Sequence, residues 1–213
     1  MRLPSDQADA EMEIFTDQES TRFIVAVDPH YQPLTRFLLA TGCRFGEAAA
    51  VQAGDLDPDA RTVRIRRAWK KGETGVYLGA PKTRRSTRAV VLPPALASEL
   101  ADLASGLTHD ELLFTSRQGR RIQAQHYRER FWLPALERAG ITKHLTPHSL
   151  RHTGASWLLA RNVSPIVVQH RLGHESLSTT SKVYAHLLTD EQLGAAAAMD
   201  AATSRPAELV PAT

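Results

Sequence analysis

The hydrophobic pattern of this chain changes its period near the middle, and this change limits the folds that the chain can adopt. Leu34, Phe37 and Leu38 lie at helical spacing, and Gly42 ends that stripe. Residues 62–68 alternate instead, so that apolar side chains fall on one face and arginines on the other. The pattern therefore predicts a helical protein with an inserted run of short strands.

Capping residues and turns mark further elements. Thr16, followed three positions later by Glu19, has the pattern of a capping box and opens a helix expected over residues 16–28. A serine–proline pair at 164–165 marks the start of another helix, which Gly173 ends. The other helices are expected near residues 45–51, 150–158 and 189–201, and the strands at residues 62–68, 76–78 and 88–93.

Length and composition agree with a single domain of this kind. The 213 residues can bury a core without disulfides or a metal, and 42% of them are hydrophobic. No apolar run approaches the roughly 20 residues that span a bilayer, and we recognise no secretion leader. The single cysteine, Cys43, excludes an internal disulfide and a cysteine-only metal site. We therefore expect a mainly α fold with a small antiparallel β-sheet, located in the cytoplasm and without membrane contact.

Positive charge is concentrated in one stretch of the chain. The net charge is only +3, yet residues 61–88 hold a single acidic residue, Glu73. The basic residues of this stretch are Arg61, Arg64, Arg66, Arg67, Lys70, Lys71, Lys82, Arg84, Arg85 and Arg88. Such an excess favours a polyanionic partner, although a solvated surface hairpin has the same composition.

Five separate segments carry residue types that act on phosphates. In chain order they contribute Arg44 in TGCRFGE, Lys82 in PKT, His148 and Arg151 in TPHSLRHT, His174 in LGH and Tyr184 in TSKVYAH. A lone His-x-x-Arg pair has little specificity, but five ordered segments that end in an isolated tyrosine are specific. Over about residues 14–187 the chain resembles the tyrosine recombinase (phage integrase) family.

The resemblance implies the catalytic domain of a DNA breaking–rejoining enzyme: a site-specific DNA recombinase or integrase, of a phage or mobile element. In such an enzyme Tyr184 attacks the scissile phosphate and forms a 3′-phosphotyrosine, which releases a 5′-hydroxyl. The 5′-hydroxyl of a second strand then reverses the step. Arg44 and Arg151 match the two arginines that neutralise the non-bridging oxygens, a task that suits forked guanidiniums. Lys82 matches the general acid that protonates the leaving oxygen.

The remaining matches imply supporting roles. His148 matches a position of proton transfer and phosphate contact, His174 matches a hydrogen-bond donor to the phosphate, and Glu47 matches a carboxylate that orients its neighbours. This chemistry implies no metal and no other cofactor. The DNA-binding residues expected beside the site are Arg64, Arg66, Arg84, Arg85 and Arg88.

The resemblance also predicts organisation and partners. Residues 1–13 are expected to form a flexible extension, residues 14–187 the catalytic domain, and residues 188–213 a C-terminal helix and tail. The expected partner is double-stranded DNA, bound by a homotetramer on paired sites and associated with the nucleoid. Family members usually carry an amino-terminal domain that clamps DNA from the opposite face, and we expect this chain to lack it.

Two other functions stay open at this point. A metallohydrolase is indicated by two histidine pairs at i,i+4 spacing, His148 with His152 and His170 with His174, since such pairs can chelate zinc. Neither pair encloses the glutamate of the His-Glu-x-x-His pattern. A catalytically silent DNA-binding fragment has the same basic stretch, and Tyr184, which lies between two apolar residues, also has the pattern of a core tyrosine.

Overall fold

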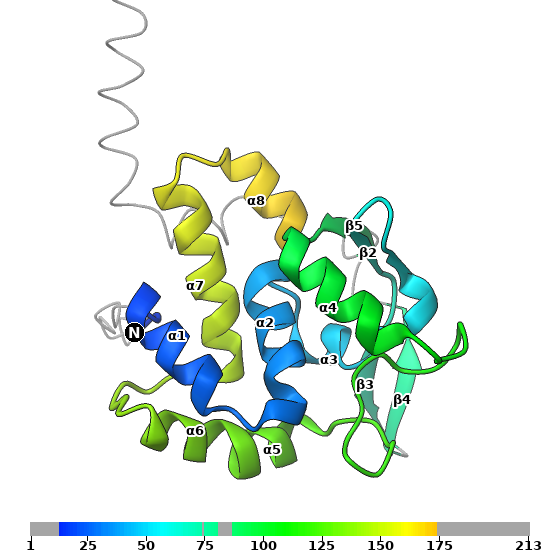
Figure 1. The fold of residues 1–213 in the computed structure, drawn as a ribbon, viewed down its shortest axis with the longest axis horizontal. Helices are drawn as coiled ribbons and strands as arrows, with labels where there is room; N and C mark the ends of the chain where they lie inside the picture. Colours follow the sequence, from blue (N-terminus) through cyan, green and yellow to red (C-terminus); the bar gives the residue numbers. More distant parts are fainter. Residues whose placement is uncertain (1–12, 74, 81–86, 174–213) are drawn as a thin grey trace, which may run out of the picture.

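Helices make up most of the fold, and two small antiparallel sheets lie beside them (Figure 1). The structure is a computed structural model that describes residues 13–73, 75–80 and 87–173. Its α-helices are α1 (Asp17–Ala26), α2 (Gln32–Thr41), α3 (Phe45–Ala48), α4 (Pro94–Ala104), α5 (Ala124–Tyr127), α6 (Leu133–Arg138), α7 (Pro147–Ala160) and α8 (Pro165–Leu172). Short 3₁₀ turns η1 (Pro29–Tyr31) and η2 (Ala53–Asp55) and a π-helical turn η4 (Arg128–Trp132) join them. The prediction of a mainly α fold with a small antiparallel β component is confirmed.

The helix ends that the sequence predicts are present. The Oγ1 atom of Thr16 accepts from the backbone N–H of Glu19 at 3.1 Å, and the Glu19 carboxylate accepts from the Thr16 N–H at 2.8 Å, which closes the capping box of α1. Pro165 occupies the first turn of α8. Gly42 and Gly173 end α2 and α8 with φ angles of 63° and 68°, a left-handed conformation that favours glycine.

The strands differ from the prediction, because they form two sheets rather than one. Strands β1 (Leu56–Asp57), β2 (Thr62–Ile65) and β5 (Arg88–Val91) pair in the order β1-β2-β5. Strands β3 (Ala68–Gly72) and β4 (Gly75–Gly79) form a separate hairpin.

The expected single strand over residues 62–68 is interrupted at Arg66 and Arg67. Both side chains donate to the same buried carboxylate oxygen of Asp55, at 2.6 and 2.8 Å. Arg66 and Arg67 lie between β2 and β3, so one alternating run contributes to two sheets.

The helical part also departs from the prediction in two places. The helix expected near residues 45–51 ends at Ala48, since Ala49 and Ala50 continue as a turn and Val51 leaves it. The helices between residues 94 and 138 are not anticipated by the sequence reasoning. The helix expected over residues 189–201 lies outside the described residues.

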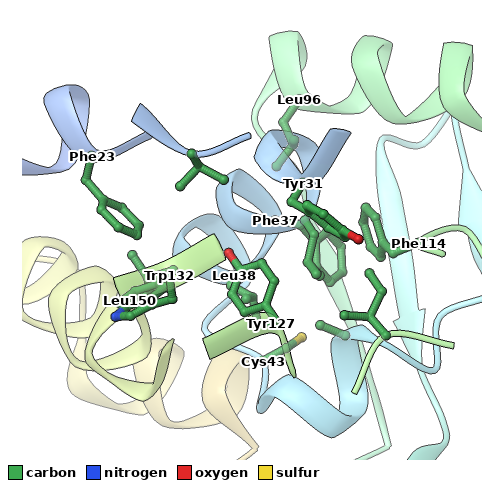
Figure 2. Close-up of a cluster of buried hydrophobic side chains, with 14 of the residues drawn as sticks. Phe23, Tyr31, Phe37, Leu38, Cys43, Leu96, Phe114, Tyr127, Trp132 and Leu150 are labelled. Carbon is green, nitrogen blue, oxygen red and sulfur yellow. The ribbon is translucent and has the colours of Figure 1, made fainter. Parts of the chain in front are cut away.

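Aromatic side chains fill the centre of the molecule (Figure 2). Phe23 and Trp132 meet at 4.4 Å between ring centroids, and Phe37 and Phe114 meet at 5.1 Å. Tyr127 is fully buried. The polar atoms of these rings are satisfied: the indole N–H of Trp132 donates to the carbonyl of Leu145 at 2.8 Å. A second, smaller cluster lies between α7 and α8 and consists of Ala155, Leu159, Val168 and Leu172.

Helices α2 and α7 approach each other closely, and this approach sets the position of Arg151. Gly154 in α7 lies directly against the backbone of Leu39 in α2, so that a Cβ atom at position 154 would come within 2.5 Å of the Leu39 carbonyl oxygen. Because Arg151 is one turn earlier on α7, the missing side chain at Gly154 lets Arg151 reach the end of α2.

The close approach predicts an unusual effect of Gly154→Ala. In an exposed helix interior this change stabilises a protein by about 1 kcal/mol, but here the new methyl group meets backbone and should cost about 1–3 kcal/mol. Chemical denaturation would measure the free energy of unfolding. Ser156→Ala in the same helix is the control, and should act through helix propensity alone, within about 0.5 kcal/mol. A more stable Gly154→Ala protein would contradict the packing described.

Candidate active site

Arg44 and Glu47 form the first part of the site, at the start of the short helix α3. The Glu47 carboxylate accepts from the backbone N–H of Arg44 at 3.1 Å and from its Nη1 atom at 2.9 Å. The carboxylate is buried, whereas 42% of the Arg44 side chain remains exposed. Glu47 therefore orients a guanidinium that stays accessible.

Arg151 forms the second part and is buried on α7. Its Nη1 atom donates to the carbonyl oxygens of Gly42, which follows α2, and of Leu172, the last residue of α8, the latter at 2.9 Å. These carbonyls have no partner within their own helices, so they are free to accept. The Nη2 atom of Arg151 is buried and has no hydrogen-bond partner among the described residues. The buried Arg151 guanidinium thus keeps one N–H donor that no described residue uses.

Gly42 makes this geometry possible. Its φ angle of 63° turns the chain after α2, and a Cβ atom there would collide with the Leu172 side chain. The carbonyl of Gly42 can then point at Arg151, while the next residues lead directly to Arg44.

Arg88 is the third guanidinium, and the structure places it differently from the expectation of a surface DNA contact. It is the first residue of β5 and its side chain is only 1% exposed. Its Nη2 atom donates to Glu47 at 3.1 Å, and its Nε atom donates to the carbonyl of Arg171 at 2.6 Å. A side chain this buried cannot reach a DNA phosphate without rearrangement.

Positive charge exceeds negative charge in this cluster. Arg44, Arg88 and Arg151 are the three guanidiniums, and the Glu47 carboxylate forms ion pairs with Arg44 and Arg88. Burial, together with the positive charge of Arg44, lowers the pKa of Arg151 to about 10, while Glu47 opposes the shift. Arg151 still remains charged at neutral pH, so the cluster is suited to bind an anion.

Cys43 lies against the cluster without being a candidate nucleophile. Its Sγ atom is 3.6 Å from Arg88 Nη2. Burial raises the pKa of the thiol, although the positive charge of Arg88 opposes this effect. The thiol is consequently protonated at neutral pH and acts as a small core side chain.

His148 and His152 lie one above the other on α7, with ring centroids 4.6 Å apart and nearly perpendicular planes. Loss of surrounding water lowers the pKa of His148, and the charges of Arg151 and Arg44 lower it further. Burial, with smaller contributions from His148 and Arg151, lowers the pKa of His152 to about 4. Both imidazoles are therefore neutral at pH 7 and able to accept a proton.

The structure describes only two of the other predicted site residues, Arg64 and Arg66. Arg64 is exposed on β2, and Arg66 is partly exposed while bound to Asp55. Lys82, Arg84, Arg85, His174 and Tyr184 lie outside the described residues. Arg171 is not among the predicted site residues, and its guanidinium donates to the carbonyl of Ala40 at 2.7 Å. Its position in the last turn of α8, just before Gly173, was the available signal.

The described residues do not support the metallohydrolase alternative. Within residues 13–73, 75–80 and 87–173, no three His, Cys, Asp or Glu side chains are arranged to hold a metal ion. The pair His148 and His152 has no third ligand there. The pair that includes His174 extends outside these residues. No helix in the described part of the chain has the length and apolar character to span a membrane.

The comparisons with known proteins agree on one family. The model of the phage integrase family matches residues 6–191. Tyrosine recombinase XerD of Bifidobacterium longum is 34% identical over 185 residues, which cover 82% of this chain and 58% of XerD. This chain spans only about half the length of the curated relatives that it matches.

Two solved structures share the fold. The integrase of transposon Tn1549, in complex with a circular intermediate DNA, has a TM-score of 0.75 at 20% identity, over 85% of this chain and 64% of that one. The catalytic domain of bacteriophage HP1 integrase has a TM-score of 0.57 at 20% identity, over 85% of this chain and 95% of that domain. At this identity the likeness shows the architecture alone.

The lowered pKa of His152 predicts a pH-dependent stability. Folding favours the neutral ring, so its contribution is complete above the ordinary pKa near 6.5 and is lost as the pH falls toward about 4. The free energy of unfolding of the wild-type protein should therefore decrease more steeply between pH 7 and pH 4 than that of His152→Gln. Urea denaturation across this range measures the difference. His144→Gln controls for the loss of an exposed imidazole, and equal slopes in wild type and His152→Gln would refute the prediction.

Proposed function

This chain belongs to the phage integrase family of tyrosine recombinases, and from that membership we propose that it is a site-specific DNA recombinase. The reaction cuts one DNA strand and rejoins it to another through a 3′-phosphotyrosine. Each step exchanges one phosphate ester for another, so no external energy source is required.

The observation that carries this proposal is the excess of guanidinium charge around one buried carboxylate. Arg44 is oriented by Glu47 but remains accessible, and Arg151 is buried with an Nη2 donor that no described residue uses. A phosphodiester that is attacked by a nucleophile gains negative charge on its non-bridging oxygens. The two forked, permanently charged guanidiniums can neutralise that negative charge, and their contacts within the protein already hold them in place.

The remaining steps rest on the motif residues. The Tyr184 oxygen forms a bond to phosphorus while the bond to the 5′-oxygen of the DNA breaks, and Lys82 gives that oxygen its proton. His148, which is neutral at pH 7, takes the tyrosine proton or returns it in the reverse step. His174 donates a hydrogen bond to the phosphate. These roles come from the family resemblance and from the chemistry of the residue types.

Organisation and partners follow as parts of the same proposal. Residues 14–187 form the catalytic domain, residues 1–13 an extension, and residues 188–213 a C-terminal helix and tail. Arg64 and Arg66 contact the backbone of double-stranded DNA together with Arg84 and Arg85. The active form is a homotetramer on paired DNA sites, in the cytoplasm near the nucleoid. We place the enzyme with a phage or mobile element rather than with a chromosome.

A covalent-capture experiment tests the proposed nucleophile. The protein is mixed with nicked DNA duplexes in the presence of a chelator, denatured, and examined for a protein–DNA band of reduced mobility. We expect a band with the wild-type protein and none with Tyr184→Phe. Tyr77→Phe is the matched control, because Tyr77 is an exposed tyrosine on β4, and it should retain the band.

The outcomes separate the competing functions. A band that survives the chelator and disappears only in Tyr184→Phe supports the recombinase and excludes a metal-dependent hydrolase. Absence of a band with every protein, together with measurable DNA binding, would favour the silent DNA-binding fragment instead. A band that persists in Tyr184→Phe would show that another residue is the nucleophile.

A further inference from the structure

We propose that Arg88 is a positioning residue: it sets the Arg44 guanidinium through Glu47 and fixes the end of α8, rather than contacting DNA. The inference rests on the proposed function, because the consequence that matters is the rate of DNA cleavage. It gives Arg88 a role that its place in a basic sequence run does not indicate.

The contacts of Arg88 join three elements. From β5 its guanidinium reaches Glu47 on α3, at 3.1 Å, and the backbone carbonyl of Arg171 at the end of α8, at 2.6 Å. The Glu47 carboxylate also holds Arg44, and Leu172, the residue after Arg171, accepts from Arg151. Arg88 therefore shares a carboxylate with Arg44, and it donates to the carbonyl next to the one that accepts from Arg151.

Burial makes this link strong. The side chains of Arg88 and Glu47 are 1% and 2% exposed. Breaking such a pair leaves an uncompensated charge in a poorly solvated place, which costs far more than losing a surface ion pair. The three elements are thus held at fixed relative positions as long as both charges are present.

Strand register explains why Arg88 faces inward while its neighbour in the sheet faces outward. Arg88 pairs with Ile65, which is buried, whereas Ala89 pairs with Arg64, which is exposed. Successive residues of a strand point to opposite faces, so Arg64 lies on the face available to DNA and Arg88 lies on the face that packs against the helices.

Lysine cannot replace this function. Arg88 uses separate nitrogens of its planar fork, Nε for the carbonyl of Arg171 and Nη2 for Glu47. A lysine keeps the charge but offers a single ammonium on a flexible stem, so it cannot hold both acceptors in the same geometry. The variant Arg88→Lys therefore keeps the positive charge of this residue and removes the geometry of the guanidinium.

The first test measures cleavage and affinity separately. With Arg88→Lys, single-turnover formation of the covalent complex at saturating DNA should slow about 10- to 100-fold, since small displacements of catalytic groups have effects of that size. The Kd for DNA should rise by no more than several-fold, because the contact with the scissile phosphate is weakened but not lost. Arg138→Lys is the control: Arg138 also donates to a helix-end carbonyl, that of Ala26, but lies apart from the cluster.

The second test asks whether Arg88 acts through Glu47. If it does, the double variant Arg88→Lys/Glu47→Gln should cleave no more slowly than the slower single variant, and the two effects should not multiply. Fully multiplicative effects would contradict this route. The same preparations would be checked by thermal denaturation, so that loss of folding is not mistaken for loss of positioning.

Salt dependence distinguishes positioning from DNA contact. Arg64→Gln should weaken DNA binding and lower the slope of log K against log salt by about 0.9, as expected for one lost phosphate contact. Arg88→Gln should leave that slope unchanged. A reduced slope with Arg88→Gln, or wild-type cleavage rates with Arg88→Lys, would overturn the inference. If Arg88→Gln does not fold, the cleavage rate of Arg88→Lys alone tests the inference.

A DNA-free readout keeps this inference distinct from the proposed function. Inorganic phosphate should raise the Tm of the wild-type protein by occupying the Arg44 and Arg151 donors, and Arg88→Lys should need several-fold more phosphate for the same rise. If the wild-type protein forms no covalent complex but this difference is seen, the proposed function fails while the positioning role stands. An identical response to phosphate in both proteins would refute the positioning role.

Discussion

The buried Glu47 carboxylate is the contact on which the site depends. It accepts from the backbone and side chain of Arg44 and from Arg88, so one side chain fixes the start of α3, the start of β5 and an accessible guanidinium. Two arginines share one carboxylate, and each carboxylate oxygen accepts from one charged guanidinium, which makes these hydrogen bonds strong. The position of the accessible cation is therefore set by packing and charge together, before any ligand binds.

Helix ends supply the remaining acceptors. Arg151 and Arg171 donate to the carbonyls of Gly42 and Ala40 at the end of α2, and Arg88 donates to the carbonyl of Arg171 at the end of α8. The C-terminal ends of helices carry partial negative charge and unsatisfied carbonyls, so they stabilise buried guanidiniums without adding carboxylates. This arrangement keeps the cluster folded and still leaves it with an excess of positive charge.

The sequence predicts local features well and long-range ones poorly. The capping box of Thr16 and Glu19 and the glycines that end α2 and α8 depend on residues a few positions apart, and all are found. The contact between Arg66 and Asp55, at the point where the strands divide into two sheets, joins residues eleven positions apart, and no local pattern reveals it. The same limit applies to the site. The contact between Arg44 and Glu47 is predictable because the two residues are three positions apart, but the basic stretch does not predict that Arg88 faces inward.

A cluster with more guanidiniums than carboxylates favours the binding of an anion. The charge of Arg44 lowers the pKa of Arg151, which means that the two guanidiniums repel each other. An anion placed between them would replace that repulsion with attraction and satisfy the Nη2 donor of Arg151 that no described residue uses. Glu47 and the helix ends allow the fold to hold this excess charge, and binding of an anion would reduce it further.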